Sequence, residues 1–383
     1  MQYSFRLAEL LGHVPDPRKR PGTIKTIVEY TGLDRHQVAA LLKNEVKYIP
    51  LKALSRLCDY LIEHGHATAG ELPGALFAIE PENFWELMAR RSRLELVLGV
   101  RRDVEADSPE VSYVVASDSV LLGELLNGVT TLGGTAKHQK ESVPNPVGHH
   151  AVPHPEHLKQ SLVWSPGQAD DSEVRDRAEK VYKEFSDSKA DKAMIGIGST
   201  KSNPVVEIIL SSAFNCEPFV LQDDVATPTE RSIPFFLRYR DNDPHPSSCI
   251  GGVNLSKSTP SKEPGIYFEG EDGKWQVAPA NTKEDCAFLC YVHRESQGRL
   301  EMVMGGFSGR ATRLLARSLA THAEEFWPPI YEGQGIQAGA YIVKFSIAGS
   351  GSKKNLDILR TDLTANTKVI PVSRESLRRS LEK

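Results

Sequence analysis

The chain has 383 residues, of which 40% are hydrophobic and 25% charged, as in ordinary globular proteins. At roughly 100–200 residues per domain, this length predicts two or three domains. The net charge of −4 excludes a chain that binds nucleic acid along its whole length. The sequence begins with no secretory leader and has no apolar run long enough to cross a bilayer, so we expect a cytoplasmic protein with no membrane partner.

The charge is distributed unevenly along the chain. Residues 1–60 carry ten lysines and arginines against six acidic residues, a local charge of +4, which leaves −8 for the remainder. A basic end on an acidic body is typical of a protein whose one end meets phosphate.

Residues 1–80 are predicted to form a domain of short helices. The three prolines and the glycine of Pro15–Gly22 break the first helical segment. Two short helices are then expected on either side of Thr31–Leu33. A longer amphipathic helix is expected over Pro50–Glu63.

The pattern between Thr23 and Asn44 predicts a helix-turn-helix. A tight turn between two steeply packed helices needs a left-handed residue, and Gly32 occupies that place. Apolar residues at the inward positions brace both helices, and Asp34 is a good cap for the second. This second helix, from about Arg35 to Lys43, would present a polar side to solvent.

That polar side predicts contacts with double-stranded DNA. Arginine and glutamine can make bidentate contacts with base edges in the major groove, and lysines contact phosphates. The residues expected to bind DNA are Arg35, His36, Gln37, Lys43, Asn44, Lys47, Arg18, Lys19, Arg20 and Lys25.

The segment IKTIVEYTGLDRHQVAALLKNEVKYIPLKALSRLCDYL (Ile24–Leu61) resembles the Cro/C1-type, or XRE-type, helix-turn-helix domains. The shared features are the T-G-L turn that leads into the recognition helix and the L-x-x-L-C-x-x-L pattern of the helix that follows. The segment is also similar to the headpiece of LacI-type repressors. The resemblance covers about 60 residues, and the rest of the chain is not recognised.

After residue 80 the pattern changes to alternating strands and helices. Strands are predicted over Leu94–Val100, Tyr113–Ala116, Ala193–Ile197, Phe219–Leu221, Ala287–Val292, Leu300–Met304 and Tyr341–Ile347. Helices are predicted after residue 116, with Ser117 and Asp118 as possible caps, and over Glu173–Phe185, Pro204–Phe214 and Ala311–Glu325. Residues 133–172 and 241–265 are expected to be loops.

This alternation predicts an α/β fold, with a mostly parallel, three-layer, Rossmann-like body over residues 81–348. Residues 349–383 are expected to form a basic C-terminal tail that ends in a short exposed helix.

Three loops that follow predicted strands predict a site for a small anionic ligand, such as a nucleotide or phosphorylated metabolite. Small residues allow a close approach of backbone to ligand, and helix starts favour anions. The ends of parallel strands share one edge of a sheet. The candidate ligand-binding residues are Arg101, Arg102, Gly198, Ser199, Thr200, Lys201, Asn203, Gly306, Ser308, Gly309, Arg310 and Thr312. Glycine in tight turns between strand and helix is the alternative explanation.

Other groups of polar residues do not predict a metal site or a cofactor. The histidines between His149 and His157 lie in a proline-broken segment, where a solvated loop is the favoured interpretation. The five cysteines, an odd number, have no spacing typical of a disulfide framework, so we expect Cys286 and Cys290 to be buried small hydrophobes.

The sequence therefore favours a dimeric transcriptional regulator whose body senses a small anionic effector. One alternative is an enzyme that processes nucleotides or nucleosides, with Glu207, Asp118 or Ser308 as the acid or nucleophile. Another is a non-catalytic sensor in a defence or stress pathway, whose helical domain recruits protein instead of DNA. The hypothesis that the protein is an enzyme is the less favoured one.

Overall fold

The computed structural model describes most of the chain. The described residues are 3–11, 23–67, 69, 72, 76–79, 81–102, 112–131, 157–187, 191–220, 228–239, 249, 251, 263–294, 297–333, 335–346 and 367–382.

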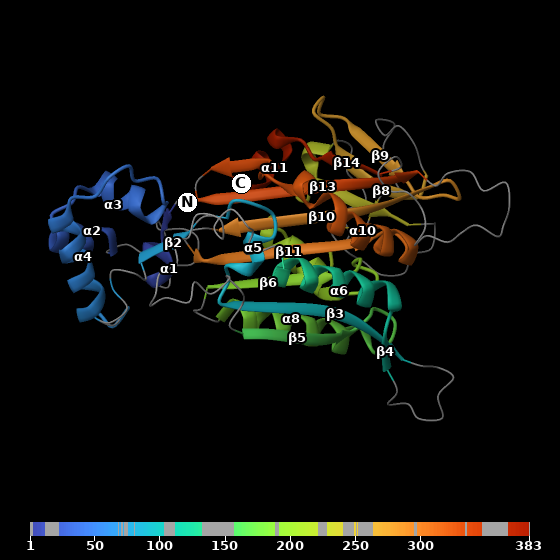
Figure 1. The fold of residues 1–383 in the computed structure, drawn as a ribbon, viewed down its shortest axis with the longest axis horizontal. Helices are drawn as coiled ribbons and strands as arrows, with labels where there is room; N and C mark the ends of the chain where they lie inside the picture. The colour runs from blue at the N-terminus through green and yellow to red at the C-terminus, as the bar shows by residue number, and fades with distance from the viewer. Residues whose placement is uncertain are drawn as a thin grey trace.

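The N-terminal residues form a separate helical head, drawn in blue at the left of Figure 1. Its elements are β1 (Tyr3–Phe5), α1 (Leu7–Leu10), α2 (Thr23–Thr31), α3 (Arg35–Leu42), α4 (Leu51–Glu63) and β2 (Phe77–Ile79). Strands β1 and β2 pair antiparallel and bring both ends of the head together. The head has its own core, in which Ile27, Val38, Leu41 and Leu57 are completely buried.

The body is built on one large sheet of nine strands in the described chain. These are β3 (Arg93–Arg102), β4 (Ser112–Val114), β5 (His157–Trp164), β6 (Lys192–Ile197), β10 (Glu284–Arg294), β11 (Arg299–Gly306), β12 (Tyr331–Gly333), β13 (Ile336–Ser346) and β14 (Thr367–Pro371). The order is β12-β13-β10-β11-β6-β3-β4, with β14 paired to β13 and β5 paired to β3.

The sheet is mixed, so the expectation of a mostly parallel, Rossmann-like body is wrong in its second half. Strands β5, β3, β6 and β11 are parallel to their neighbours in this group. The pairs of β10 with β11 and β13, and of β13 with β12 and β14, are antiparallel. The described body is therefore α/β, with an antiparallel half and a parallel half to which β4 adds one short antiparallel pair with β3.

Helices cover both faces of the sheet, which gives three layers. Because successive strand residues point to opposite faces, Leu94, Leu96 and Leu98 of β3 pack with α5 (Glu86–Ala89), α6 (Ala116–Thr131) and α10 (Gly309–His322). Val97 of the same strand packs on the other side with α8 (Asp171–Asp187) and α9 (Pro204–Ala213). Two 3-10 turns, Pro228–Glu230 and Ala323–Phe326, complete the helical segments.

Several strands were not predicted from the sequence. Strand β5 falls inside the expected loop 133–172, and a small antiparallel sheet is formed by β7 (Phe235–Arg238), β8 (Gly265–Glu269) and β9 (Trp275–Pro279). Apolar residues of this small sheet join the core on the α8 side of the large sheet. The strand predicted at Phe219 does not form, and Phe219 has a positive φ of 62°.

The described part of the C-terminal segment, residues 367–382, packs on the body and does not form an exposed tail. Strand β14 extends the large sheet beside β13. Helix α11 (Arg374–Leu381) follows, and its Ser376, Leu377 and Ser380 are buried. The helix itself was predicted, but it was expected to be exposed, and the burial of these residues was not foreseen.

Among the described residues, none of the helices combines the length and apolar character needed to span a bilayer. All five cysteines are free, and Cys249, Cys286 and Cys290 are buried, as predicted for Cys286 and Cys290.

Candidate DNA-binding surface and candidate ligand cavity

The turn between α2 and α3 has the local geometry that the sequence predicts. Gly32 has a φ of +76°, and its N–H donates to the carbonyl of Val28 at 2.9 Å. Asp34 then caps α3, since its carboxylate accepts from the N–H of Gln37 at 2.8 Å. The side chain of Gln37 in turn accepts from the N–H of Asp34 at 3.1 Å, which completes a capping box.

The outward side of α3 is open to solvent. Arg35 and His36 are exposed, and so is Lys47 in the connection that follows. Lys43 is half-buried at the end of the helix. Lys25, on α2, is exposed and forms a loose ion pair with Glu29, 3.8 Å between Nζ and Oε1. The side chains of Lys25, Arg35, His36 and Lys47 are thus accessible from solvent.

Two of the predicted DNA contacts have structural roles within the head. Gln37 is half-buried, and its carbonyl oxygen is occupied by the capping box, so in the free protein only its amide N–H groups face outward. Asn44 ends α3 in a left-handed conformation, with φ of 59°, and its side chain accepts from the N–H of Phe5. Arg18, Lys19 and Arg20 lie outside the described residues.

A cavity of about 130 Å³ lies at the carboxyl ends of the parallel strands. It is bounded by the end of β3, the start of α6 and the loops that follow β6 and β11, so it brings together the three predicted loops. The residues around it are Arg101, Val115, Ser117, Asp118, Ser199, Lys201, Ser202, Tyr239, Gly306, Phe307, Ser308, Gly309 and Thr312.

The acid of this cavity is Asp118, in the first turn of α6. Its side chain is only 4% exposed, and the hydroxyl of Ser117 lies 3.3 Å from its carboxylate. Burial raises the pKa of Asp118 to about 6, against the opposing effects of Ser117 and of the charge on Arg101. From the sequence, Asp118 was predicted as a possible helix cap, and it was not included among the ligand-binding residues.

Cations and aromatic rings line the rest of the cavity. Arg101 forms no hydrogen bond or ion pair with another side chain in the described part of the chain. The ammonium of Lys201 lies 5.0 Å from the ring centre of Tyr239, which stacks on Phe307 at 4.9 Å. The two aromatic residues were not predicted. Phe307 lies in the glycine-bearing loop after Leu300–Met304, but only its small and polar neighbours were selected, and Tyr239 follows β7, a strand that the sequence pattern did not reveal.

Some predicted ligand residues line the cavity but are already engaged. Ser308 caps α10 and donates to Asp285 at 2.6 Å. Thr312 accepts from the N–H of Gly306 at 3.1 Å and donates to the carbonyl of Ser308. These two hydroxyl groups hold the loop together, and we assign the polar chemistry of the cavity to Asp118, Arg101 and Lys201.

Other predicted ligand residues do not line the cavity. The buried amide of Asn203 donates to the carbonyls of Val97 and Ile197 and accepts from Val205. Arg310 pairs with Asp285 at 3.0 Å, and Arg102 lies over the ring of Trp164. Thr200 is buried, and its hydroxyl has no hydrogen-bond partner among the described residues.

The glycines around the cavity serve backbone packing. Gly198 has a φ of +106°, which other residues rarely adopt. A Cβ on Gly305 would lie 2.4 Å from the backbone of Gly198, and one on Gly306 would lie 2.1 Å from the nitrogen of Thr312. Glycine at these positions is therefore explained by contact between strands and loops, without a ligand.

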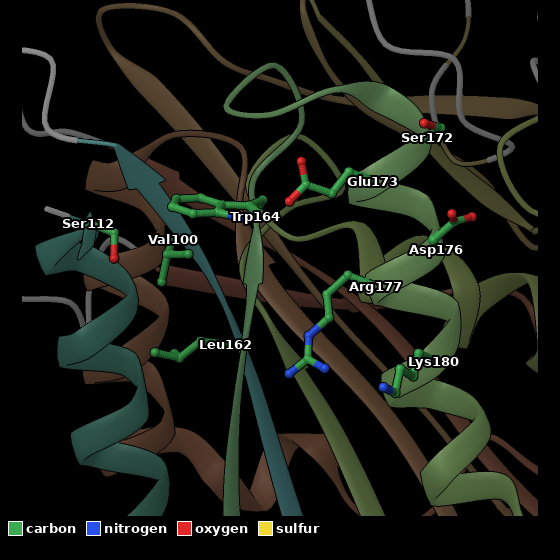
Figure 2. A pocket seen from close by; sticks show the side chains of 9 residues that line it. All are labelled: Val100, Ser112, Leu162, Trp164, Ser172, Glu173, Asp176, Arg177 and Lys180. Carbon is green, nitrogen blue, oxygen red and sulfur yellow. The ribbon is translucent and has the colours of Figure 1, made fainter. Parts of the chain in front are cut away.

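A larger hollow of about 670 Å³ lies beside the edge strand β5, and Figure 2 shows its side chains. Val100, Leu162 and Trp164 line it from the sheet. Helix α8 contributes two acids and two bases spaced four residues apart, Glu173 with Arg177 and Asp176 with Lys180. Because the two signs offset each other on an open surface, this hollow shows no preference for an anion.

Comparison with known proteins assigns a family to the head and none to the body. Residues 18–62 match the family model of the Cro/C1-type HTH DNA-binding domain. No family model matches the body, and no curated protein and no solved structure matches the chain. The head is thus a Cro/C1-type helix-turn-helix domain, as its sequence predicts, and it indicates a DNA-binding regulator.

Proposed function

We propose that the protein is a DNA-binding transcriptional regulator that acts as a homodimer and whose body binds a small anionic effector, a nucleotide or phosphorylated metabolite. The observation that carries the DNA-binding part is the exposed side of α3, with Arg35 and His36, on a helix-turn-helix of the Cro/C1 type. Lys47, in the connection after α3, is exposed as well. A dimer follows from the short stretch of bases that one recognition helix can read.

DNA binding is tested with the purified full chain and its own upstream DNA over a range of salt concentrations. The affinity should fall steeply as salt rises, because bound cations displace counterions from phosphates. The double variant Arg35→Ala/Lys43→Ala should bind at least tenfold more weakly and show a shallower salt dependence.

The matched control is Arg177→Ala/Lys180→Ala, which removes the same charge from α8, away from the head. This control should bind DNA as the wild type does. Absent or salt-independent binding by the wild type, or equal losses in both double variants, would contradict the assignment.

The effector part of the proposal is supported by Arg101 and Lys201, two cations that line the same cavity beside a helix start. Inorganic phosphate and nucleotides should raise the Tm of the wild type and not that of Arg101→Ala/Lys201→Ala. If an anion raised the Tm of both proteins equally, it would bind outside this cavity.

A catalytic role is the second candidate function, because Asp118 is a buried acid that faces the cavity with a pKa raised to about 6. Such a group can transfer protons near neutral pH. Glu207 is buried and accepts from the N–H groups of Phe219 and Cys249, and Ser308 is a helix cap, so neither supports this role. If the wild type turned over a nucleotide and Asp118→Asn abolished this activity, the catalytic role would be established.

A docking role for the head, in a defence or stress sensor, is favoured by two apolar side chains at its surface. Tyr48 is 74% exposed and Leu51 is 78% exposed, beside the start of α4. Protein binding that Tyr48→Ala/Leu51→Ala abolishes, together with absent DNA binding, would favour this role over the regulator.

A further inference from the structure

The carboxyl group of Asp118 has fewer partners than its burial requires. Buried carboxylates usually accept several hydrogen bonds or pair with a cation. Asp118 is 4% exposed, yet its side chain has a single long contact, 3.3 Å to the hydroxyl of Ser117, and no ion pair within the described chain. A donor supplied from the cavity would complete its hydrogen bonding.

Asp118 and Arg101 carry opposite charges and line the same cavity, but they do not form an ion pair. Arg101 lowers the pKa of Asp118 from a distance. Lys201 also lines the cavity, above the ring of Tyr239. The cavity therefore offers an acceptor on the α6 side and cations at the ends of β3 and β6.

The size of the cavity limits what it encloses. About 130 Å³ is the space of a few water molecules, at roughly 30 Å³ each in the liquid. That space holds a small polar group, and the remainder of a larger ligand would extend out of the opening. The enclosed group has to satisfy the acid and the cations together.

We propose that the cavity selects anions that also carry an N–H donor group, which is either the ammonium of an amino acid or the exocyclic amine of a nucleobase. The donor binds Asp118, and the anionic group binds Arg101 and Lys201. This inference rests on the proposed effector site and specifies the chemistry of its ligand.

The experiment compares matched pairs of ligands by calorimetry at pH 7.5 on the full chain. Aspartate and succinate differ by the ammonium group, and GMP and IMP differ by the exocyclic amine. In one of these pairs the amine-bearing member should bind at least tenfold more tightly. The pair that shows this preference identifies the source of the donor.

Variants assign the preference to its residues. Asp118→Leu removes both acceptors at a similar volume, and the two members of the pair should then bind equally. Arg101→Ala should weaken both members by a similar factor and keep the preference. Asp176→Asn, an exposed acid on α8, is the control and should behave as the wild type does.

The outcomes separate this inference from the proposed function. Equal binding of both members to the wild type, or a preference that Asp118→Leu retains, overturns the inference and leaves the anion site in place. If no anion of either pair and no phosphate binds, the effector part of the proposed function fails with it, whereas DNA binding is measured independently.

Discussion

At the scale of single residues, Asp118 opposes the stability of the fold around it. A carboxylate that is buried with one weak partner disfavours its charged form, which is why its pKa rises to about 6. At neutral pH the folded protein holds this charge at a free-energy cost. Residues kept at such a cost are often functional, and Asp118 faces the cavity that we assign to the effector.

We predict that Asp118→Asn stabilises the ligand-free protein at neutral pH. The folded-state pKa lies about two units above the unfolded value near 3.8, so the stability linked to this proton is complete below pH 3.8 and is lost as pH rises through about 6. The variant should therefore exceed the wild type by about 3 kcal/mol in free energy of unfolding at pH 7.5, and by little at pH 4. Urea unfolding across this pH range measures the difference.

The control for this prediction is Asp176→Asn, because Asp176 is exposed on α8. Its difference from the wild type should stay flat with pH. A flat difference for Asp118→Asn as well would show that the carboxyl group is solvated in the folded protein.

At the scale of elements, the recognition helix depends on its first turn. The capping box of Asp34 and Gln37 satisfies two backbone N–H groups that would otherwise have no partner at the start of α3. Helix α3 is short, and its own hydrogen bonds give it little stability in isolation. The cap therefore contributes to holding Arg35 and His36, which we propose contact DNA, in place at the start of α3.

We predict that Asp34→Ala destabilises α3 locally by about 1 kcal/mol, whereas Asp34→Asn is neutral because asparagine caps helices equally well. Amide hydrogen exchange at Val38 and Leu41 should become about fivefold faster in the alanine variant only. DNA affinity should fall in the same variant. Unchanged exchange in Asp34→Ala would show that packing alone holds the helix.

The helices and strands that the sequence predicted correctly carry strong local signals. Gly32 and Asp34 mark a turn and a cap. The parallel strands β3, β6 and β11 are mostly apolar because both their faces are buried, although Glu95 interrupts β3 and Glu301 interrupts β11. Strand β5 was missed since Leu158 and Leu162 are exposed on one of its faces and only Ser161 and Val163 are buried on the other.

The antiparallel half of the sheet could have been predicted from the length of one connection. Only residues 295–298 separate β10 from β11, whereas a parallel connection needs a dozen or more. The cavity loops were placed correctly because carboxyl ends of parallel strands share an edge. The internal roles of Asn203 and Arg310 depend on distant partners, and no local pattern reveals these.

At the scale of the whole molecule, the C-terminal segment completes the body. Helix α11 is fixed to the small sheet, because Ser376 donates to Glu269 at 2.7 Å and Arg379 pairs with the same carboxylate. Leu377 is fully buried in the core on the α8 side. The last residues of the described chain thus bridge both sheets of the body.

We predict that Leu377→Ala lowers the free energy of unfolding of the body by about 2–5 kcal/mol, as for other buried leucines. Leu381, at the end of the same helix, is half-buried, so Leu381→Ala should cost clearly less. Urea unfolding of the two variants gives the comparison. A change below about 0.5 kcal/mol in Leu377→Ala would restore the interpretation of a free tail.

In Figure 1 the head lies at the side of the body where β3 begins, and β3 runs away from the head toward β4. The residues around the cavity include Arg101, near the far end of β3. We therefore expect that the operator and the effector proposed above would not collide when both are bound, so that a ternary complex could form. If the small molecule weakened DNA binding, the effect would have to be transmitted through the body. By thermodynamic linkage, DNA would then weaken binding of the small molecule by the same factor.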